Sequence, residues 1–115
     1  MNDDTETNQH MHAIVIGPDE YDLTSALEAV GITVDRVVEI ATGDRLHAAG
    51  IETADLLVIT DVGEATAIPI AREHNPTVRI IVYADDSLPE FAKPIADYII
   101  DPDLMTPTVI AEELM

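Results

Sequence analysis

The sequence contains no cysteine and few aromatic residues. Without cysteine, the chain cannot form disulfides, thiolate metal sites or a cysteine nucleophile. Aromatic residues make up only 3% of the 115 residues, so the apolar 47% must supply a mainly aliphatic core. No apolar run reaches the roughly 20 residues of a membrane span, and the polar N-terminus does not resemble a signal peptide. We therefore expect one cytoplasmic domain that is not inserted in a membrane.

Positive charge is also scarce. Five Lys and Arg residues face 23 Asp and Glu residues, which gives a formal net charge of −18, and Lys93 is the only lysine. Salt screens the repulsion between like charges, so this composition favours a halophilic protein from a salt-rich cytoplasm. An acidic surface that binds a partner is the alternative. The same charge argues against binding nucleic acid or anionic membranes.

The pattern of apolar residues predicts an α/β domain over residues 11–115, after a disordered acidic tail over residues 1–10. Strands are expected at residues 12–17, 33–40, 54–60, 78–84 and 96–100. Helices are expected at residues 23–30 before Gly31, at 42–49 before Gly50, from Thr66 to His74, in a short piece from Ser87, and from Thr106 onward. Strands that alternate with helices in this way indicate a parallel sheet covered by helices on both faces.

The stretch of residues 12–23 is the first place to look for a site. An apolar strand runs into Gly17 and then into a helix, and this junction often holds a phosphate or a metal in α/β domains. Asp19, Glu20 and Asp22 stand here, where phosphate-binding loops carry glycines. Asp19 and Asp22 are spaced like an N-cap and an N3 acid, so capping of the helix is an alternative to a ligand site.

Three later segments resemble the N-terminal domain of potassium-uptake regulators, the TrkA-N or RCK family. These segments read AGIETADLLVITD, REHNPTVRIIVYADD and IADYIIDPDL. The resemblance implies a Rossmann-like fold that binds NAD or another adenine nucleotide and regulates an ion channel or transporter. It also implies a homodimer or a membrane-transport partner. The nucleotide site that it implies consists of Gly17, Asp19, Glu39, Asp44, Thr60, Asp61 and Thr66.

The chain departs from the family at several of these positions. Asp19 and Asp22 replace the second and third glycines of G-x-G-x-x-G, and a carboxylate there repels a phosphate. Thr66 replaces an Asn and Tyr83 replaces an Arg. These changes predict that nucleotide binding is weak or lost. A helix and a strand are also missing after the second strand, which leaves five strands in the order 2-1-3-4-5.

That strand order is shared by flavodoxin-like proteins and response regulators, which suggests a second comparison. A phosphorylated receiver domain needs acids after strands one and three, a hydroxyl after strand four and a Lys-Pro after strand five. Asp19, Glu20 and Asp61 could supply the acids and bind Mg²⁺. Ala84 replaces the hydroxyl residue and Asp101 replaces the lysine, so phosphorylation switching is not expected.

The leading hypothesis is a regulatory or interaction module of RCK type, with no catalytic residues. The alternative is a Mg²⁺-dependent receiver-like or phosphotransfer domain that uses Asp19, Glu20 and Asp61. A third hypothesis is a structural protein that stabilises a partner through exposed helix faces, for which an uncovered apolar patch would be the signature.

Overall fold

The computed structural model describes residues 11–114, so the tail predicted over residues 1–10 lies outside the described residues. The strands are β1 (His12–Ile16), β2 (Thr33–Val37), β3 (Leu56–Ile59), β4 (Arg79–Tyr83) and β5 (Tyr98–Ile100). The α-helices are α2 (Leu23–Ala29), α3 (Gly43–Ala48), α4 (Ala67–His74) and α5 (Pro107–Leu114), and two 3₁₀ turns are η1 (Ile51–Thr53) and η2 (Val62–Glu64). None of the described helices is long and apolar enough to span a membrane.

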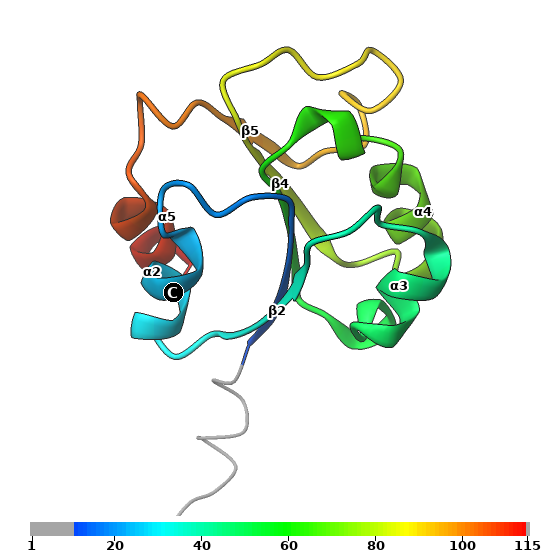
Figure 1. Ribbon diagram of the computed structural model, residues 1–115, viewed down its shortest axis with the longest axis horizontal. Coiled ribbons are helices and arrows are strands. Elements are labelled where there is room, and N and C mark those ends of the chain that lie inside the picture. The colour runs from blue at the N-terminus through cyan, green and yellow to red at the C-terminus, as the bar shows by residue number, and fades with distance from the viewer. Residues whose placement is uncertain (1–10, 115) are drawn as a thin grey trace, which may run out of the picture.

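The five strands form one parallel sheet in the order β2-β1-β3-β4-β5 (Figure 1). The predicted fold class and strand order are therefore confirmed. Strand β2 lies on one side of β1, and β3 and the later strands lie on the other, so the topological switch point falls between β1 and β3. The loops at the carboxyl ends of these two strands meet there, and α/β folds bind ligands at such points.

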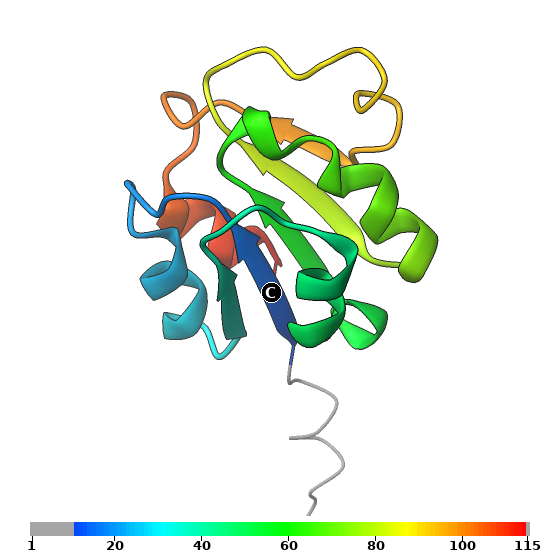
Figure 2. The same cartoon turned by 45° about the vertical axis from the view of Figure 1, so that its right-hand side comes forward.

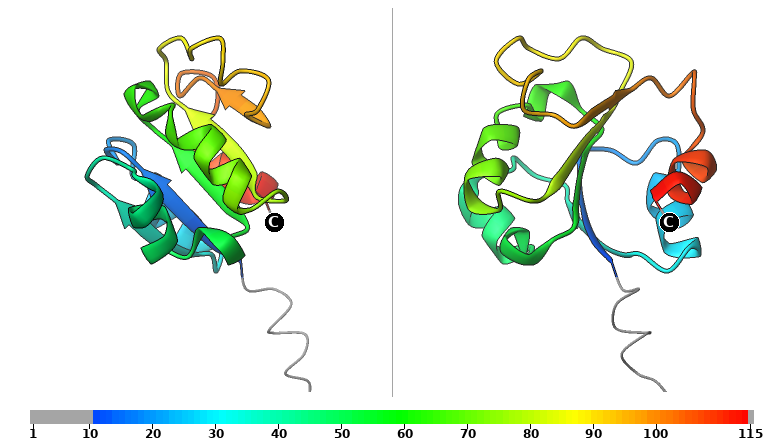
Figure 3. Two further views of the ribbon diagram at one scale, coloured as in Figure 1. Left: turned by 90° about the vertical axis from the view of Figure 1, so that its right-hand side faces the viewer. Right: turned by 180° about the vertical axis from the view of Figure 1, so that it is seen from behind.

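Helices cover both faces of the sheet, as predicted. Helices α2 and α5 pack against each other on one face, while α3, η1 and α4 lie together on the other (Figures 1 and 3). Successive residues of the buried strands enter opposite cores because side chains alternate along a strand. In β1, Ala13 and Val15 join the core under α2 and α5, whereas Ile14 and Ile16 join the core under α3 and α4.

The helix predicted from Ser87 does not form. Residues 84–97 instead make a loop of turns, seen in yellow arching beyond β4 in Figure 2. Pro94 explains the difference, because it has no N–H for a helical hydrogen bond and its ring would clash with the carbonyl four residues earlier. The loop is anchored by Leu88 and Ala92, which are buried in the core under α3 and α4.

The other helix boundaries agree with the sequence to within one or two residues. Gly31 adopts φ +92° after α2, as its predicted role as a helix stop requires. Thr66 precedes α4, which places Pro69 in the first turn, and α5 begins at Pro107. Strand β2 is shorter than predicted and ends at Val37, so residues 38–40 lie in the loop before α3.

Candidate functional site

The loops after β1, β3, β4 and β5 meet at one end of the sheet, which we call the carboxyl edge. They enclose a hollow of about 260 Å³. Four carboxylates, two tyrosines and a threonine are among its lining residues, namely Glu20, Asp61, Asp85, Asp86, Tyr21, Tyr83 and Thr60. Because no cation lines this hollow, it is a poor site for a phosphate or any other anion.

Asp19 caps helix α2. Its carboxylate accepts hydrogen bonds from the backbone N–H groups of Leu23, at 2.7 Å, and Thr24, at 3.3 Å. These are two of the donors that the first turn of a helix leaves without a partner. Asp22 is the residue just before the helix, has φ +60° and makes no side-chain cap bond, so it is not the N3 acid expected from the spacing. The capping role expected at this loop thus belongs to Asp19.

Gly17 approaches the β3 loop closely. It has φ +106°, and a Cβ atom there would lie 2.5 Å from Oγ1 of Thr60 and 3.2 Å from Cβ of Asp61. The Thr60 hydroxyl lies 2.6 Å from the carbonyl of Pro18 and 3.1 Å from that of Ile16, so it ties the β1 loop to the end of β3. Packing between these two loops is therefore a sufficient reason for glycine at this position, with no nucleotide required.

Only two of the three predicted Mg²⁺ ligands line the same hollow. Asp61 accepts a hydrogen bond of 2.9 Å from the backbone of Gly63 and caps η2, while Asp19 is turned onto α2. Glu20 lines the hollow with Asp61 but without Asp19. Among residues 11–114, no group of three or more His, Asp or Glu side chains is arranged to hold a metal ion. The arrangement favours the capping interpretation of these acids.

The positions expected to decide phosphorylation are where the sequence placed them. Ala84 follows β4 directly, and Asp101 and Pro102 follow β5. Lys93, the only lysine, lies in the loop before β5 and forms an ion pair with Glu90 at 2.8 Å. The carboxyl edge therefore has neither the hydroxyl nor the lysine of a phosphorylated receiver.

Two tyrosines, Tyr21 and Tyr83, line the hollow of the carboxyl edge. The sequence did not predict either of them as a site residue. The rings of Tyr21 and Tyr83 meet edge to face with centroids 5.8 Å apart. Tyr83 is almost completely buried and donates a hydrogen bond of 2.8 Å to the carbonyl of Met105. Burial raises the pKa of Tyr83, and nearby Tyr21 raises it further. Desolvation also raises the pKa of Tyr21, and the negative charges of Asp85 and Glu20 add to this shift.

The residues implied as a nucleotide site are only partly brought together. Gly17, Glu39 and Asp61 share a second hollow of about 220 Å³ with Arg36 and Glu64. Arg36 donates to the carbonyl of Gly17 at 2.6 Å and Glu64 accepts from the backbone of Ala41, so both are already engaged.

One implied residue of that hollow already has another partner, and two further implied residues lie outside the hollow. Glu39 forms an ion pair with Arg45 at 2.7 Å. Asp44 lies in the first turn of α3, and Thr66 precedes α4 without a side-chain cap bond. Neither lines the two hollows of the carboxyl edge.

A histidine cluster away from the carboxyl edge was also missed. Glu52, in η1, accepts from His47 at 2.8 Å and lies 3.7 Å from His74. The hydrogen bond to Glu52 raises the pKa of His47. The three residues come from α3, η1 and α4, so no sequence spacing could have joined them.

A family model matches residues 13–114 and carries the description "Family of unknown function (DUF7126)". The chain belongs to this family. The match covers nearly all of the described residues and includes every strand except the first residue of β1. No curated protein is similar enough to the sequence to count as a match.

Several solved structures share the fold. One is an orphan response regulator of H. pylori, with a TM-score of 0.69, 16% identity, and 90% of this chain and 92% of that chain covered. A protein of Burkholderia pseudomallei described as pilus assembly-related has a TM-score of 0.63 and 19% identity, with 90% and 86% covered. An atypical orphan response regulator, described as having a phosphorylation-independent regulatory mechanism, has a TM-score of 0.65 and 14% identity, with 90% and 91% covered. At these identities the likeness establishes the flavodoxin-like fold that these structures share, and not an activity.

Proposed function

We propose that this chain is a receiver-like regulatory module that acts by contact with a partner protein, without phosphoryl transfer. One observation carries the proposal: Asp19 and Asp61, the acids that follow β1 and β3, are used as helix caps. Asp19 holds the first turn of α2 and Asp61 holds η2. A phosphorylated receiver needs such carboxylates free to bind Mg²⁺ and to accept a phosphoryl group, and it needs a cation to stabilise the added charge.

The similar structures support this choice over the RCK hypothesis. They include two orphan response regulators, and one of them is described as phosphorylation-independent. Regulation of potassium transport, a membrane-transport partner and a homodimer remain predictions. That nucleotide binding is weak or lost also remains a prediction. Its test is calorimetric titration with NADH, ATP and ADP at molar KCl, and micromolar affinity would overturn it.

The hypothesis of a structural protein with an apolar helix face finds little support. Large apolar side chains that are exposed lie mostly in loops and in β5, and only Val109 belongs to a helix in the described part of the chain. An apolar interaction surface therefore fits the β5 edge of the sheet better than a helix.

The test is thermal unfolding in molar KCl with and without millimolar MgCl₂ and beryllium fluoride, a mimic of the phosphoryl group. We expect no change in Tm beyond the change caused by an equal rise in ionic strength from KCl, because Asp19 and Asp61 are already engaged as caps. Asp61→Asn and Glu28→Gln remove the same charge, the latter from an exposed position on α2. A rise in Tm with Mg²⁺ that Asp61→Asn abolishes and Glu28→Gln preserves would contradict the proposal and restore the cation site.

A further inference from the structure

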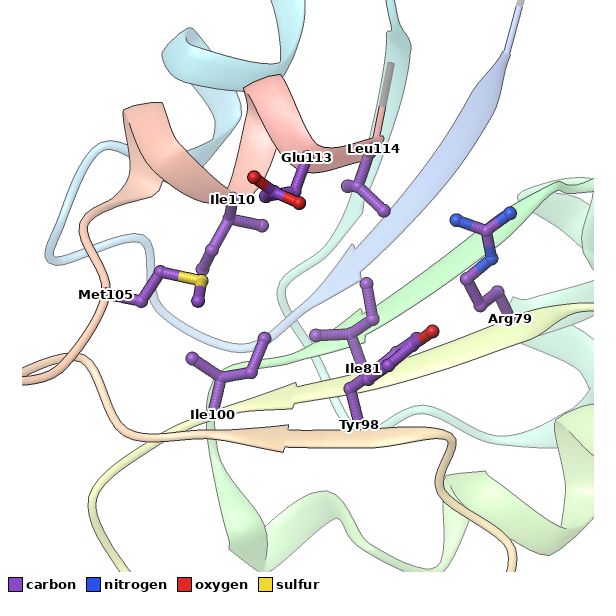
Figure 4. A pocket seen from close by; sticks show the side chains of 8 residues that line it. All are labelled: Arg79, Ile81, Tyr98, Ile100, Met105, Ile110, Glu113 and Leu114. Atoms are coloured by element: carbon purple, nitrogen blue, oxygen red, sulfur yellow. The ribbon is translucent and has the colours of Figure 1, made fainter.

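A third hollow lies between β5 and helix α5, on the face of the sheet that α5 covers. We call it the β5–α5 groove (Figure 4). Its volume is about 210 Å³, and its walls are mostly apolar. Ile81, Tyr98 and Ile100 form the strand side, Ile110 and Leu114 form the helix side, and Arg79 lies at one end. Small-molecule sites usually measure about 300 Å³ or more, so this groove suits one or two side chains better.

Strand β5 is an open edge of the sheet. In the part of the chain that the structure describes, it pairs with β4 alone. It contains no charged residue, and its Tyr98 and Ile99 are 55% and 50% exposed. The opposite edge strand, β2, carries Asp35 and Arg36, the kind of charge that blocks pairing with another chain. The two edges thus differ, and only β5 is suited to accept a further strand.

Arg79, the first residue of β4, adds a charge to the groove. Four of the five cationic side chains are engaged: Arg45, Arg72 and Lys93 in ion pairs, and Arg36 with a backbone carbonyl. The guanidinium of Arg79 is exposed and has no hydrogen bond or ion pair with any residue of the described range. Glu113 lines the same groove without pairing with it. In a chain with 23 acids, an unpaired cation at an apolar groove is well placed for a carboxylate from outside.

We propose that the β5–α5 groove binds an extended acidic–apolar segment of a partner protein as an additional strand on β5. The partner's backbone satisfies the open edge of β5, one of its apolar side chains enters the groove, and its Asp or Glu pairs with Arg79. This proposal deepens the proposed function, on which it rests for the assumption of a protein partner. It names the partner's chemistry and the surface that receives it.

A second copy of the chain is a poorer occupant. Two β5 strands paired antiparallel about Ile99 would place Asp97 of one copy opposite Asp101 of the other, at both ends of the short pair. Like charges directly opposite each other destabilise a strand pair, and each copy brings a net charge of −18. A partner segment with a single acid near Arg79 avoids both problems.

The experiment is a selection of random seven-residue peptides displayed on phage against the folded protein, at the lowest KCl concentration that keeps it folded. We expect the selected peptides to alternate apolar and polar residues and to share an Asp or Glu. A labelled copy of the selected peptide should shift backbone amide NMR signals of β5 and α5. Its affinity should fall about tenfold or more in Arg79→Ala and recover in part in Arg79→Lys.

Lys93→Ala is the matched control, since it removes the same charge from a residue outside the groove, and it should leave the affinity unchanged. Recovery of no peptide, shifts confined to the carboxyl edge, or an affinity insensitive to Arg79→Ala would overturn the proposal. Sedimentation that shows a dimer dissociated by Arg79→Ala would also overturn it, in favour of a second copy. None of these readouts involves Mg²⁺ or beryllium fluoride, so failure here is distinguishable from failure of the proposed function.

Discussion

The capping acids of the carboxyl edge and the cation of the β5–α5 groove differ in whether they have partners among the described residues. At the carboxyl edge, Asp19 and Asp61 bond to backbone N–H groups, and the Thr60 hydroxyl reaches backbone carbonyls. At the groove, the guanidinium of Arg79 has no partner among residues 11–114, and one side of β5 is unpaired. The capping acids of one region are thus already engaged, while the cation of the other has no partner in that range.

This difference shows how a loop can resemble a ligand site in sequence and still serve the fold. Carboxylates before a helix are equally suited to a metal and to the first turn of that helix. Once backbone N–H groups of the helix donate to these carboxylates, a ligand must compete with those hydrogen bonds. An unpaired group at an open edge faces no such competition. We therefore expect substitutions of the capping acids to affect stability, and substitutions of the exposed groove residues Arg79 and Tyr98 to affect binding alone.

The largest effect should come from Gly17→Ala. The substitution forces a side chain into a backbone with φ +106° and places its Cβ 2.5 Å from Oγ1 of Thr60. Backbone strain and the forced movement of the β3 loop should together cost about 2 to 4 kcal/mol of unfolding free energy. Urea unfolding at fixed molar KCl would measure it.

Gly31→Ala separates the two causes. Gly31 has φ +92°, but a Cβ there would meet no atom within 4 Å, so only the backbone strain remains, at about 1 to 2 kcal/mol. Equal losses in the two variants would mean that the approach of Gly17 to Thr60 is not tight, and the packing explanation for this glycine would then be withdrawn.

The next effect should come from Asp19→Ala. Two backbone donors of α2 lose their acceptor, which should cost about 1 kcal/mol, within a range of about 0.5 to 2 kcal/mol. Asp22→Gly should be neutral or stabilising, because Asp22 makes no cap bond and has φ +60°, which glycine adopts more readily. Urea midpoints at matched salt would compare them. A larger loss for Asp22→Gly than for Asp19→Ala would reverse the assignment of the cap.

The sequence predicted the fold because the fold depends on periodic patterns. Apolar runs marked all five strands, and the missing helix and strand after β2 led to the observed strand order. The prediction of a helix from Ser87 was wrong. The local capping pattern favours a helix start there, but Pro94 would fall inside the helix and disrupt it. At Asp19 the sequence predicted two possible roles, and only the direction of the carboxylate could decide between them.

The groove could not be predicted in the same way. It depends on which of five cations lacks a partner, and the partners of the other four lie up to 25 positions away in sequence. It also depends on the strand order, which makes β5 an edge. In the sequence, Arg79 belongs to an apolar strand and Tyr98 to another, and nothing in their spacing indicates that they share a wall. Such a site is a property of the tertiary structure.

Tyr83→Phe tests whether the hydroxyl of Tyr83, which lines the hollow of the carboxyl edge, stabilises the fold. Loss of the hydrogen bond to Met105 should cost about 1 kcal/mol at neutral pH. The raised pKa of Tyr83 means that the folded chain holds this proton more tightly than the unfolded chain. Stability should therefore be full below about pH 10 and fall as the pH rises through the folded pKa. Urea unfolding across this range should show a shallower alkaline loss in Tyr83→Phe. An alkaline gain in the unsubstituted protein would contradict the assigned direction.

Tyr98→Phe should have the smallest effect and is the matched case from the groove. Its ring is 55% exposed, and its hydroxyl has no hydrogen bond to any residue in the described range, so removing the hydroxyl should change the unfolding free energy by less than about 0.5 kcal/mol. The same measurement at neutral pH therefore compares one tyrosine from each region with one atom removed from each. If Tyr98→Phe cost as much as Tyr83→Phe, the groove would have a structural role of its own. It would then no longer be a surface left free for a partner, because a binding surface can lose an exposed hydroxyl without weakening the fold beneath it.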